Sequence, residues 1–241
     1  MDLEDFIHRS HGARNVDELF ALYQKAMASL GYDRLVFSLM TDHPTIDRKA
    51  GHGIISNYPS DWMAYYGEKN FAPLDPVRAG MYATVGPFLW GEMEKTQPLT
   101  RAQMLFMNEA QEAGLHSGIG IPLRGVMGAI AGVGAASSNS HVEADPFTLA
   151  KAHMYTSQFY NVFLALEARE VDVKPVYLSD REREVLQLTA CGMTFKDIAR
   201  ALNVSPHTVR TYKASILKKF GVKDITVAAL RASRQYLIQA V

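Results

Sequence analysis

The chain has 241 residues, 48% of them hydrophobic, and a formal net charge of zero, a composition typical of a globular protein with one large or two small domains. No run approaches the roughly 18 consecutive apolar residues of a membrane-spanning helix, and the acidic N-terminus lacks the order of a signal peptide. A single cysteine, Cys191, excludes an intrachain disulfide framework, so we expect a cytoplasmic protein in which Cys191 is a small buried helix residue.

The first 170 residues mix helical and strand patterns. Asn15 and Glu18 have the spacing of a capping box before a helix that Gly31 ends. Strands are predicted at 34–40, 53–58, 118–124 and 128–136, and helices at 60–66, 76–83, 100–113 and 147–170. The pattern predicts an α+β fold, an α/β/α sandwich over an antiparallel sheet, in a sensing domain that spans residues 1–170. The regular βα alternation of a phosphoacceptor receiver domain is absent.

An aromatic run between Asn57 and Trp90 holds both tryptophans, several tyrosines and Asp75. Aromatic rings supply flat apolar walls with N–H and O–H donors, whereas a buried carboxylate needs donors of its own. Two interpretations stay open on the residues alone. One is a small-molecule cavity with a few placed polar groups. The other is an aromatic core in which Asp75 caps a helix that begins at Pro76.

The strand predicted at 128–136 is unusually rich in glycine and alanine. Such residues give a strand little side chain to pack. We therefore expect another part of the protein or a ligand to fill the space beside this strand.

A domain boundary is predicted at residues 171–177, where Pro175 disfavours helix at Lys174. We expect this segment to be a linker and residues 178–241 to form a second domain of four helices. Ser179, Thr194 and Ser205 have the positions of N-caps for the first three helices, and the fourth is predicted at about 226–235. The second and third helices, joined by the turn at 203–205, have the pattern of a helix-turn-helix.

Charge is divided unevenly between the two predicted domains. Residues 177–241 carry 11 Lys and Arg against 5 Asp and Glu, a net +6, whereas residues 1–176 carry 14 against 20, a net −6. A basic domain fits DNA because each neutralised phosphate releases counterions. We expect Arg210, Thr211 and Ala214 to reach base edges in the major groove, and the phosphate contacts to come from Lys196, Lys213 and Lys218. The alternative for any one of them is a solvated residue on a small helical bundle.

Segment 178–235 resembles the LuxR/NarL-type helix-turn-helix. The matching positions are Ser179, Arg181-Glu-Arg-Glu184, Gly192, Lys196-Asp-Ile-Ala199, Leu202, Ser205, Thr208-Val209, Lys218-Lys219 and Val222. Tyr212 stands where this family usually has histidine, and a tyrosine there can still donate to a phosphate.

The aromatic run resembles the acyl-homoserine-lactone-binding domain of LuxR-type quorum-sensing regulators. The matching residues are Asn57-Tyr-Pro-x-x-Trp62-x-x-x-Tyr66, Asp75-Pro76 and Trp90, and together with the helix-turn-helix the resemblance covers residues 15–235.

Roles for individual residues are implied by this resemblance. Trp62 would donate its indole N–H to the lactone carbonyl, Asp75 would accept the amide N–H of the ligand, and Tyr58 would donate to the acyl carbonyl. Trp90 would pack beside the lactone ring, and Tyr66 would wall the pocket. The implied acyl-pocket positions are Val36, Ser38, Met40, Ile54, Phe106 and Leu115.

The sequence departs from the family pattern at Gly134, where many relatives carry a Ser or Thr that hydrogen-bonds the ligand. Gly120 and Gly132 also match pocket-lining positions, so three glycines are expected to leave extra volume beside the acyl chain. We therefore expect a bulky, branched or aromatic acyl group, with Ser38 as a candidate replacement for the missing hydroxyl.

The resemblance implies a ligand-dependent transcriptional regulator. It would form a homodimer on a pseudo-palindromic promoter site, with dimer contacts from the helices at 147–170 and 226–238, and would activate transcription through RNA polymerase. An acyl-homoserine lactone would be its signal, without a cofactor, a metal or a membrane partner.

Two other functions are weighed against this one. A small-molecule enzyme with a DNA-binding tail, for example one that hydrolyses a lactone, would need catalytic residues. The eight histidines and the aspartates show no metal spacing, no G-x-S-x-G and no phosphate loop, so we expect no enzyme. The other alternative is a constitutive or protein-responsive regulator in which the sensing cavity is vestigial.

Overall fold

The computed structural model describes residues 1–241 except 97, 140–141, 143, 169–175 and 240–241. It divides into two compact units, one comprising Met1–Gly125 and Ala129–Glu170 and the other comprising Val126–Gly128 and Val171–Val241. Most of the predicted linker at 171–177 lies outside the described residues. The helix predicted to reach residue 170 ends at Glu167, because Ala168 has an extended backbone.

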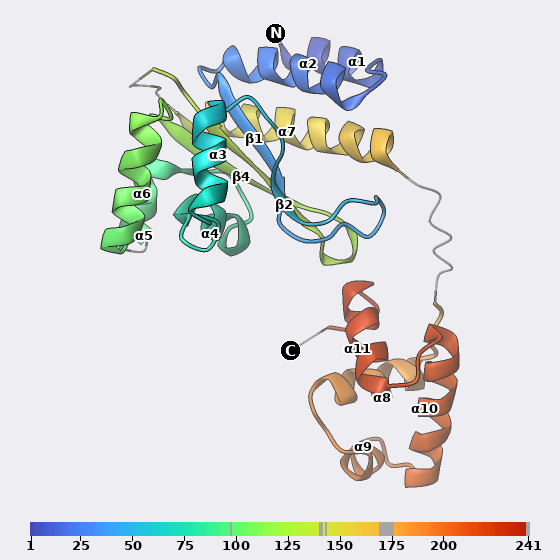
Figure 1. Ribbon diagram of the computed structural model, residues 1–241. Coiled ribbons are helices and arrows are strands. Elements are labelled where there is room, and N and C mark those ends of the chain that lie inside the picture. Colours follow the sequence, from blue (N-terminus) through green and yellow to red (C-terminus); the bar gives the residue numbers. More distant parts are fainter. Residues whose placement is uncertain (97, 140–141, 143, 169–175, 240–241) are drawn as a thin grey trace. The chain divides into compact units, whose positions relative to one another are not determined.

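An antiparallel sheet forms the middle layer of the first unit (Figure 1). Its described strands run in the order β2-β1-β5-β4-β3. Their bounds are β1 Arg34–Leu39, β2 Gly51–Ser56, β3 Phe88–Leu89, β4 Gly118–Arg124 and β5 Ile130–Ala136. In this register Val36 pairs with Gly134, Ser38 with Gly132, and Gly120 with Gly134. Because side chains alternate along a strand, these small residues share one face of the sheet.

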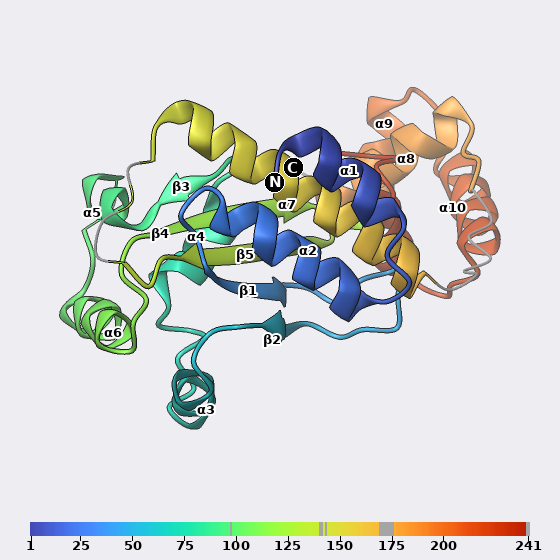
Figure 2. The ribbon, with the colours of Figure 1, turned by 90° about the horizontal axis from the view of Figure 1, so that it is seen from above.

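Large apolar side chains occupy the opposite face, which we call the packed face. Helices α1 (Leu3–His11), α2 (Val16–Ala28) and α7 (Pro146–Glu167) cover it (Figure 2). Phe37 of β1 and Tyr23 of α2 both meet Phe159 of α7, the rings of Tyr23 and Phe159 being stacked with centroids 4.6 Å apart. This face therefore holds the main hydrophobic core of the unit.

The face with Gly120, Gly132 and Gly134, which we call the glycine face, is covered by different helices. They are α3 (Ser60–Glu68), α4 (Pro76–Ala83), the 3₁₀ turn η1 (Trp90–Glu92), α5 (Met93–Thr96) and α6 (Arg101–Glu112). Together the two sets of helices and the sheet form the expected α/β/α sandwich with an antiparallel sheet, which confirms the predicted fold class.

The second unit contains the four predicted helices in its described part: α8 (Asp180–Ala190), α9 (Phe195–Ala201), α10 (Pro206–Phe220) and α11 (Ile225–Arg234). Ser179, Thr194 and Ser205 accept hydrogen bonds from backbone N–H groups three residues ahead, as N-caps do. The buried side chains that join the helices include Val185, Ile198 and Ile216. α9 and α10 meet at the turn where Asn203 has a φ of 53°.

Several sequence expectations differ from the structure. Cys191 is exposed, so the expectation of a buried cysteine is wrong: α8 ends at Ala190, and Cys191 is its C-cap. The strand expected from residue 128 begins at Ile130, because residues 126–128 form the 3₁₀ turn η2 with Met127 at a φ of 54°. Helix α1 was not predicted. None of the helices in the described part of the chain combines the length and the apolar character of a membrane span.

Candidate functional site

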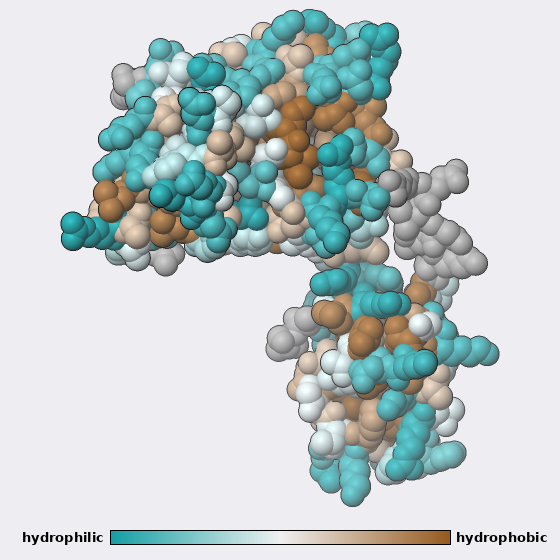
Figure 3. Space-filling model, viewed as in Figure 1, coloured by the Kyte–Doolittle hydropathy of each residue, from teal (hydrophilic) through white to brown (hydrophobic). Residues whose placement is uncertain are grey.

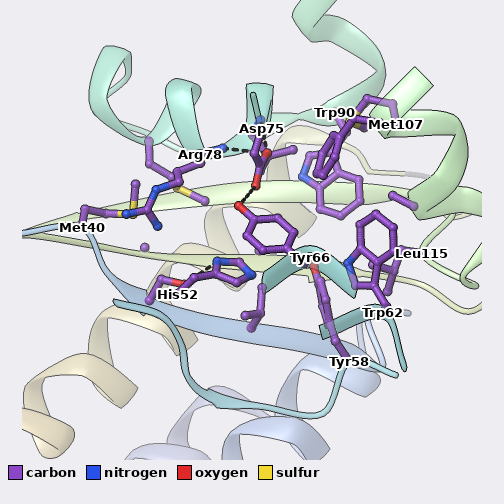
Figure 4. Close-up of a pocket in the computed structure, with 18 residues that line it drawn as sticks. Met40, His52, Tyr58, Trp62, Tyr66, Asp75, Arg78, Trp90, Met107 and Leu115 are labelled. Atoms are coloured by element: carbon purple, nitrogen blue, oxygen red, sulfur yellow. Dashed lines mark hydrogen bonds between the residues drawn. The ribbon is translucent and has the colours of Figure 1, made fainter. Parts of the chain in front are cut away.

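A buried pocket lies between the glycine face and helices α3, α4 and α6 (Figure 4). It encloses about 50 Å³, and its lining is mainly apolar and aromatic. Each ligand-binding residue chosen from the sequence lines it, namely Tyr58, Trp62, Tyr66, Asp75, Trp90, Val36, Ser38, Met40, Phe106, Leu115 and Gly134. Ile54 and Gly120, which the resemblance also implied, are absent from the lining.

Asp75 lines the pocket and also begins helix α4. Its Oδ1 accepts the backbone N–H groups of Val77 at 2.8 Å and Arg78 at 3.1 Å, and its Oδ2 accepts the hydroxyl of Tyr66 at 3.0 Å. Burial raises the pKa of this carboxyl, and the hydrogen bonds that it accepts act in the opposite direction. The two interpretations left open by the sequence therefore describe the same residue, because the capping carboxylate also lies in the pocket wall.

Among the polar groups of the pocket that have no partner within the described residues are two donors, the hydroxyl of Tyr58 and the indole Nε1 of Trp90, and both atoms are buried. Burial raises the pKa of Tyr58 well above its usual value, so its hydroxyl keeps its proton. Buried polar groups are nearly always hydrogen-bonded in folded proteins, so two such groups beside one pocket mark a place for acceptors.

Trp62 lies in a group of aromatic rings at one end of the pocket. Its ring centroid is 5.7 Å from that of Phe106 and 6.2 Å from that of Phe71. Aromatic pairs at these distances attract each other beyond the effect of burial alone. This end of the pocket is therefore a firm apolar wall.

The protein's own side chains occupy the space beside the glycines. The ring of Phe88 fills the position of a Cβ at Gly120, so the expected extra volume there is wrong. The ring of Trp90 does the same at Gly118, which requires a glycine for this close approach. At Gly132 the neighbour is the flexible Met81, whose Sδ would lie 2.7 Å from a Cβ.

Two polar lining residues, His52 and Arg78, were missed in the sequence. The ring of His52 stacks on Tyr66 with centroids 4.1 Å apart, and its Nδ1 lies 3.2 Å from Oγ of Ser38. Burial, and then the positive charge of Arg78, lowers the pKa of His52 to about 4. Arg78 lies on the short helix that Asp75 caps, and its residue type gave no signal of a pocket position.

Ser38, the candidate replacement for a hydroxyl missing at Gly134, has two partners in the structure. Its Oγ accepts the N–H of Gly53 at 3.1 Å and also meets His52. Its hydroxyl therefore holds strand β2 and the histidine ring in place.

The residues chosen for DNA contact lie on α9 and α10 of the second unit. Those whose side chains are exposed are Lys196, Arg210, Thr211, Ala214 and Lys218. Lys213 is half-buried, with its ammonium group 4.9 Å from the ring centre of Phe195, a contact between the two helices. An exposed face of α10 with an arginine and small side chains has the form of a groove-reading surface.

Comparison with known proteins follows the same division. An autoinducer-binding-domain family model matches residues 15–162, and a model of the luxR family of bacterial regulatory proteins matches residues 176–232.

Individual relatives span nearly the whole chain. The chain is 25% identical over 232 residues to the transcriptional activator protein AnoR of Acinetobacter nosocomialis, covering 95% of each. It is 28% identical over 236 residues to the quorum-sensing regulator RhlR of Pseudomonas aeruginosa, covering 96% of this chain and 92% of the relative. Its fold is similar to a crystal structure of SdiA of Escherichia coli, with a TM-score of 0.61, 21% identity, and coverage of 98% of this chain and 97% of that one.

Proposed function

The chain belongs to the LuxR-type transcriptional regulators that carry an autoinducer-binding domain and a helix-turn-helix, and we propose that an N-acyl-homoserine lactone is its signal. The observation that carries this proposal is the polar pattern of the pocket. Asp75 offers an acceptor, and the hydroxyl of Tyr58 is a buried donor without a partner in the described residues. An acyl-homoserine lactone brings one amide N–H and carbonyl acceptors, which match this pattern.

Asp75 has capacity for one more hydrogen bond. A carboxylate has about four lone-pair sites, and three of those on Asp75 already accept Val77, Arg78 and Tyr66. The ligand's amide N–H would take the fourth. The carbonyl contacts would come from Tyr58 and Trp62, with Trp90 and Tyr66 against the lactone ring.

The size of the pocket requires side chains to move when the ligand enters. The enclosed volume of about 50 Å³ is far below the several hundred Å³ of typical ligand sites. Met40, Met81 and Met107 line the pocket, and methionine side chains adapt easily to new neighbours. A bulky, branched or aromatic acyl group would need the side chain of Met81 to move away from Gly132, because Phe88 fills the space at Gly120.

For the output of the protein, we propose a homodimer that binds a pseudo-palindromic promoter site and activates transcription through RNA polymerase. Arg210, Thr211 and Ala214 would meet base edges, and the phosphate contacts would come from Lys196, Lys213 and Lys218. Exposed apolar residues support the expected dimer helices: Phe147 and Met154 on α7 are 73% and 53% exposed, and Leu230 on α11 is 56% exposed.

The test of the signal is ligand binding by the full chain. We expect at least one member of a panel of acyl-homoserine lactones to raise the midpoint temperature of thermal unfolding. At a hundred times its Kd, such a ligand adds about 2.7 kcal/mol to the free energy of unfolding. If no lactone of any acyl length or shape shifts the midpoint, the signal proposal is wrong.

A variant of Asp75 tests the proposed contact itself. In Asp75→Asn the amide oxygen must stay toward Val77 and Arg78 to cap α4, which turns the NH₂ group, a donor, toward the ligand. We expect lactone affinity to fall by about tenfold or more. Asp145→Asn is the matched control, because Asp145 caps α7 through Thr148 and does not line the pocket.

A further inference from the structure

Apart from the indole of Trp90, which packs against the proposed lactone ring, two buried nitrogens of the pocket take no part in the contacts proposed for the lactone. Nη1 of Arg78 and Nε2 of His52 have no hydrogen-bond partner within the part of the chain that the structure describes. Figure 4 shows both side chains on the Met40 side of the pocket, and the hydrogen bond from Tyr66 to Asp75 lies between them and the two tryptophans. The pocket therefore has a second polar end, away from the indoles.

The contact between Ser38 and Nδ1 of His52 is compatible with a ring proton on Nε2. Oγ of Ser38 accepts the N–H of Gly53 at 3.1 Å, and when its own hydrogen points to Nδ1 of His52, 3.2 Å away, the ring proton must be on Nε2. The lowered pKa keeps this ring neutral near pH 7. In this arrangement Nη1 of Arg78 and Nε2 of His52 are both donors, and only an acceptor satisfies them.

The charges of the lining residues restrict the kind of acceptor. Asp75 and Arg78 are the charged residues among those that line the pocket, and their formal charges cancel. A ligand carboxylate would add a second negative charge to a buried site that already contains Asp75, which is costly in a poorly solvated interior. An uncharged oxygen accepts hydrogen bonds without disturbing this balance.

Resting on the proposed lactone signal, we propose that its acyl group ends in an uncharged oxygen acceptor, a ketone or hydroxyl, which Arg78 and His52 bind. A plain alkyl end would leave two buried donors without an acceptor, and such donors lose their full hydration. We expect the oxygen-ended ligand to bind about ten- to a hundredfold more tightly than the alkyl-ended one.

The experiment compares three homoserine lactones of equal acyl length by titration calorimetry with the full chain. Their acyl groups end in a methyl group, a methyl ketone or a carboxylate. The expected order of affinity is ketone first, then methyl, with the carboxylate weakest. Equal binding of the ketone and methyl ligands overturns the inference and leaves the lactone signal standing. Tightest binding of the carboxylate also overturns it, and so does absence of binding by all three when another lactone of the panel binds.

A variant identifies the residue responsible. Arg78→Met removes the charge and the donor while keeping an unbranched side chain, so we expect it to abolish the ketone preference. Arg101→Met, an exposed residue of α6 outside the pocket lining, should keep the wild-type preference. A ketone preference that survives Arg78→Met contradicts the inference. If Arg78→Met does not fold, the comparison of the three ligands on the wild-type chain decides.

Discussion

The two faces of one sheet are built for opposite purposes. On the packed face, Phe37, Ile121 and Val133 are fully buried in a core of large side chains. On the glycine face, Gly132 and Gly134 leave space that the side chains of Met81 and Tyr58 approach. Because a strand alternates its side chains, neighbouring residues of β1 and β5 serve stability and recognition separately. The composition of a strand is therefore informative only when its two faces are considered separately.

Among substitutions on the glycine face, the largest effect on stability and ligand binding is expected at Gly118. A Cβ in Gly118→Ala would collide with the ring of Trp90, so we expect the indole to be displaced. Overpacking of this kind costs about 1–3 kcal/mol of unfolding free energy, and the lactone should lose its binding surface as well. Urea unfolding and calorimetric titration measure the two effects.

Gly67→Ala is the control for that substitution. Gly67 lies in α3, and a Cβ there meets nothing within 4 Å. Replacing a helical glycine by alanine should raise stability by up to about 1 kcal/mol and leave lactone affinity unchanged. Wild-type affinity in Gly118→Ala would mean that Trp90 does not form part of the ligand site.

Acid is expected to destabilise the first unit through two histidines whose pKa values are lowered. The pKa of His52 is lowered to about 4, mainly by burial, and burial also lowers that of His43. An unfolded histidine titrates at about 6.5, so neutral His52 contributes stability that is complete above this pH and is lost as the pH falls toward 4. We expect a loss of about 1–2 kcal/mol between pH 7 and pH 5, measured by urea unfolding.

The two histidines have different partners, so their substitutions should affect ligand binding differently. Nε2 of His43 lies 3.0 Å from the hydroxyl of Tyr160 on α7, whereas His52 lies in the pocket. His43→Phe and His52→Phe should each reduce the acid sensitivity of folding. Only His52→Phe should change the pH dependence of lactone affinity, and the same change in His43→Phe would show that the faces are coupled.

The smallest effects are expected from two hydroxyls. Tyr23 donates to Oγ1 of Thr156 at 2.7 Å, because the hydroxyl of Thr156 donates in turn to the carbonyl of Ala152. Tyr23→Phe should therefore lower the unfolding free energy by about 1 kcal/mol without affecting the ligand.

Tyr58→Phe should have the opposite pattern. The hydroxyl of Tyr58 has no partner in the described structure, so its loss should leave stability unchanged or raise it by up to about 1 kcal/mol. Lactone affinity should fall by about tenfold. Clear destabilisation in Tyr58→Phe would show that this hydroxyl contributes to the core and not to the ligand site.

Local chemistry made much of the fold predictable. Ser179, Thr194 and Ser205 marked the starts of three helices because capping is a contact between near neighbours in sequence. Helix α1 was missed although Asp2 caps it and Leu3, Phe6 and Ile7 have helical spacing, because its apolar stripe extends over only about two turns.

The site was less predictable because its polar end depends on distant packing. His52 precedes Gly53, whose φ of 63° interrupts the regular alternation of β2. The strand predicted from the sequence began at Gly53 and so left His52 out. Arg78 has the residue type of a solvated helix position, and only the tertiary fold directs one of its nitrogens into the pocket. The side chain of Phe88 reaches Gly120 from another strand, which no local pattern indicates.

The shared use of Asp75 has an evolutionary consequence. Its carboxylate is oriented by two peptide groups of α4 before any signal arrives, so little ordering remains to be done on binding. Few substitutions should be tolerated at this position, because a replacement must still cap the start of α4. Changes of signal preference should therefore accumulate elsewhere in the pocket wall, while this aspartate stays fixed across diverging descendants.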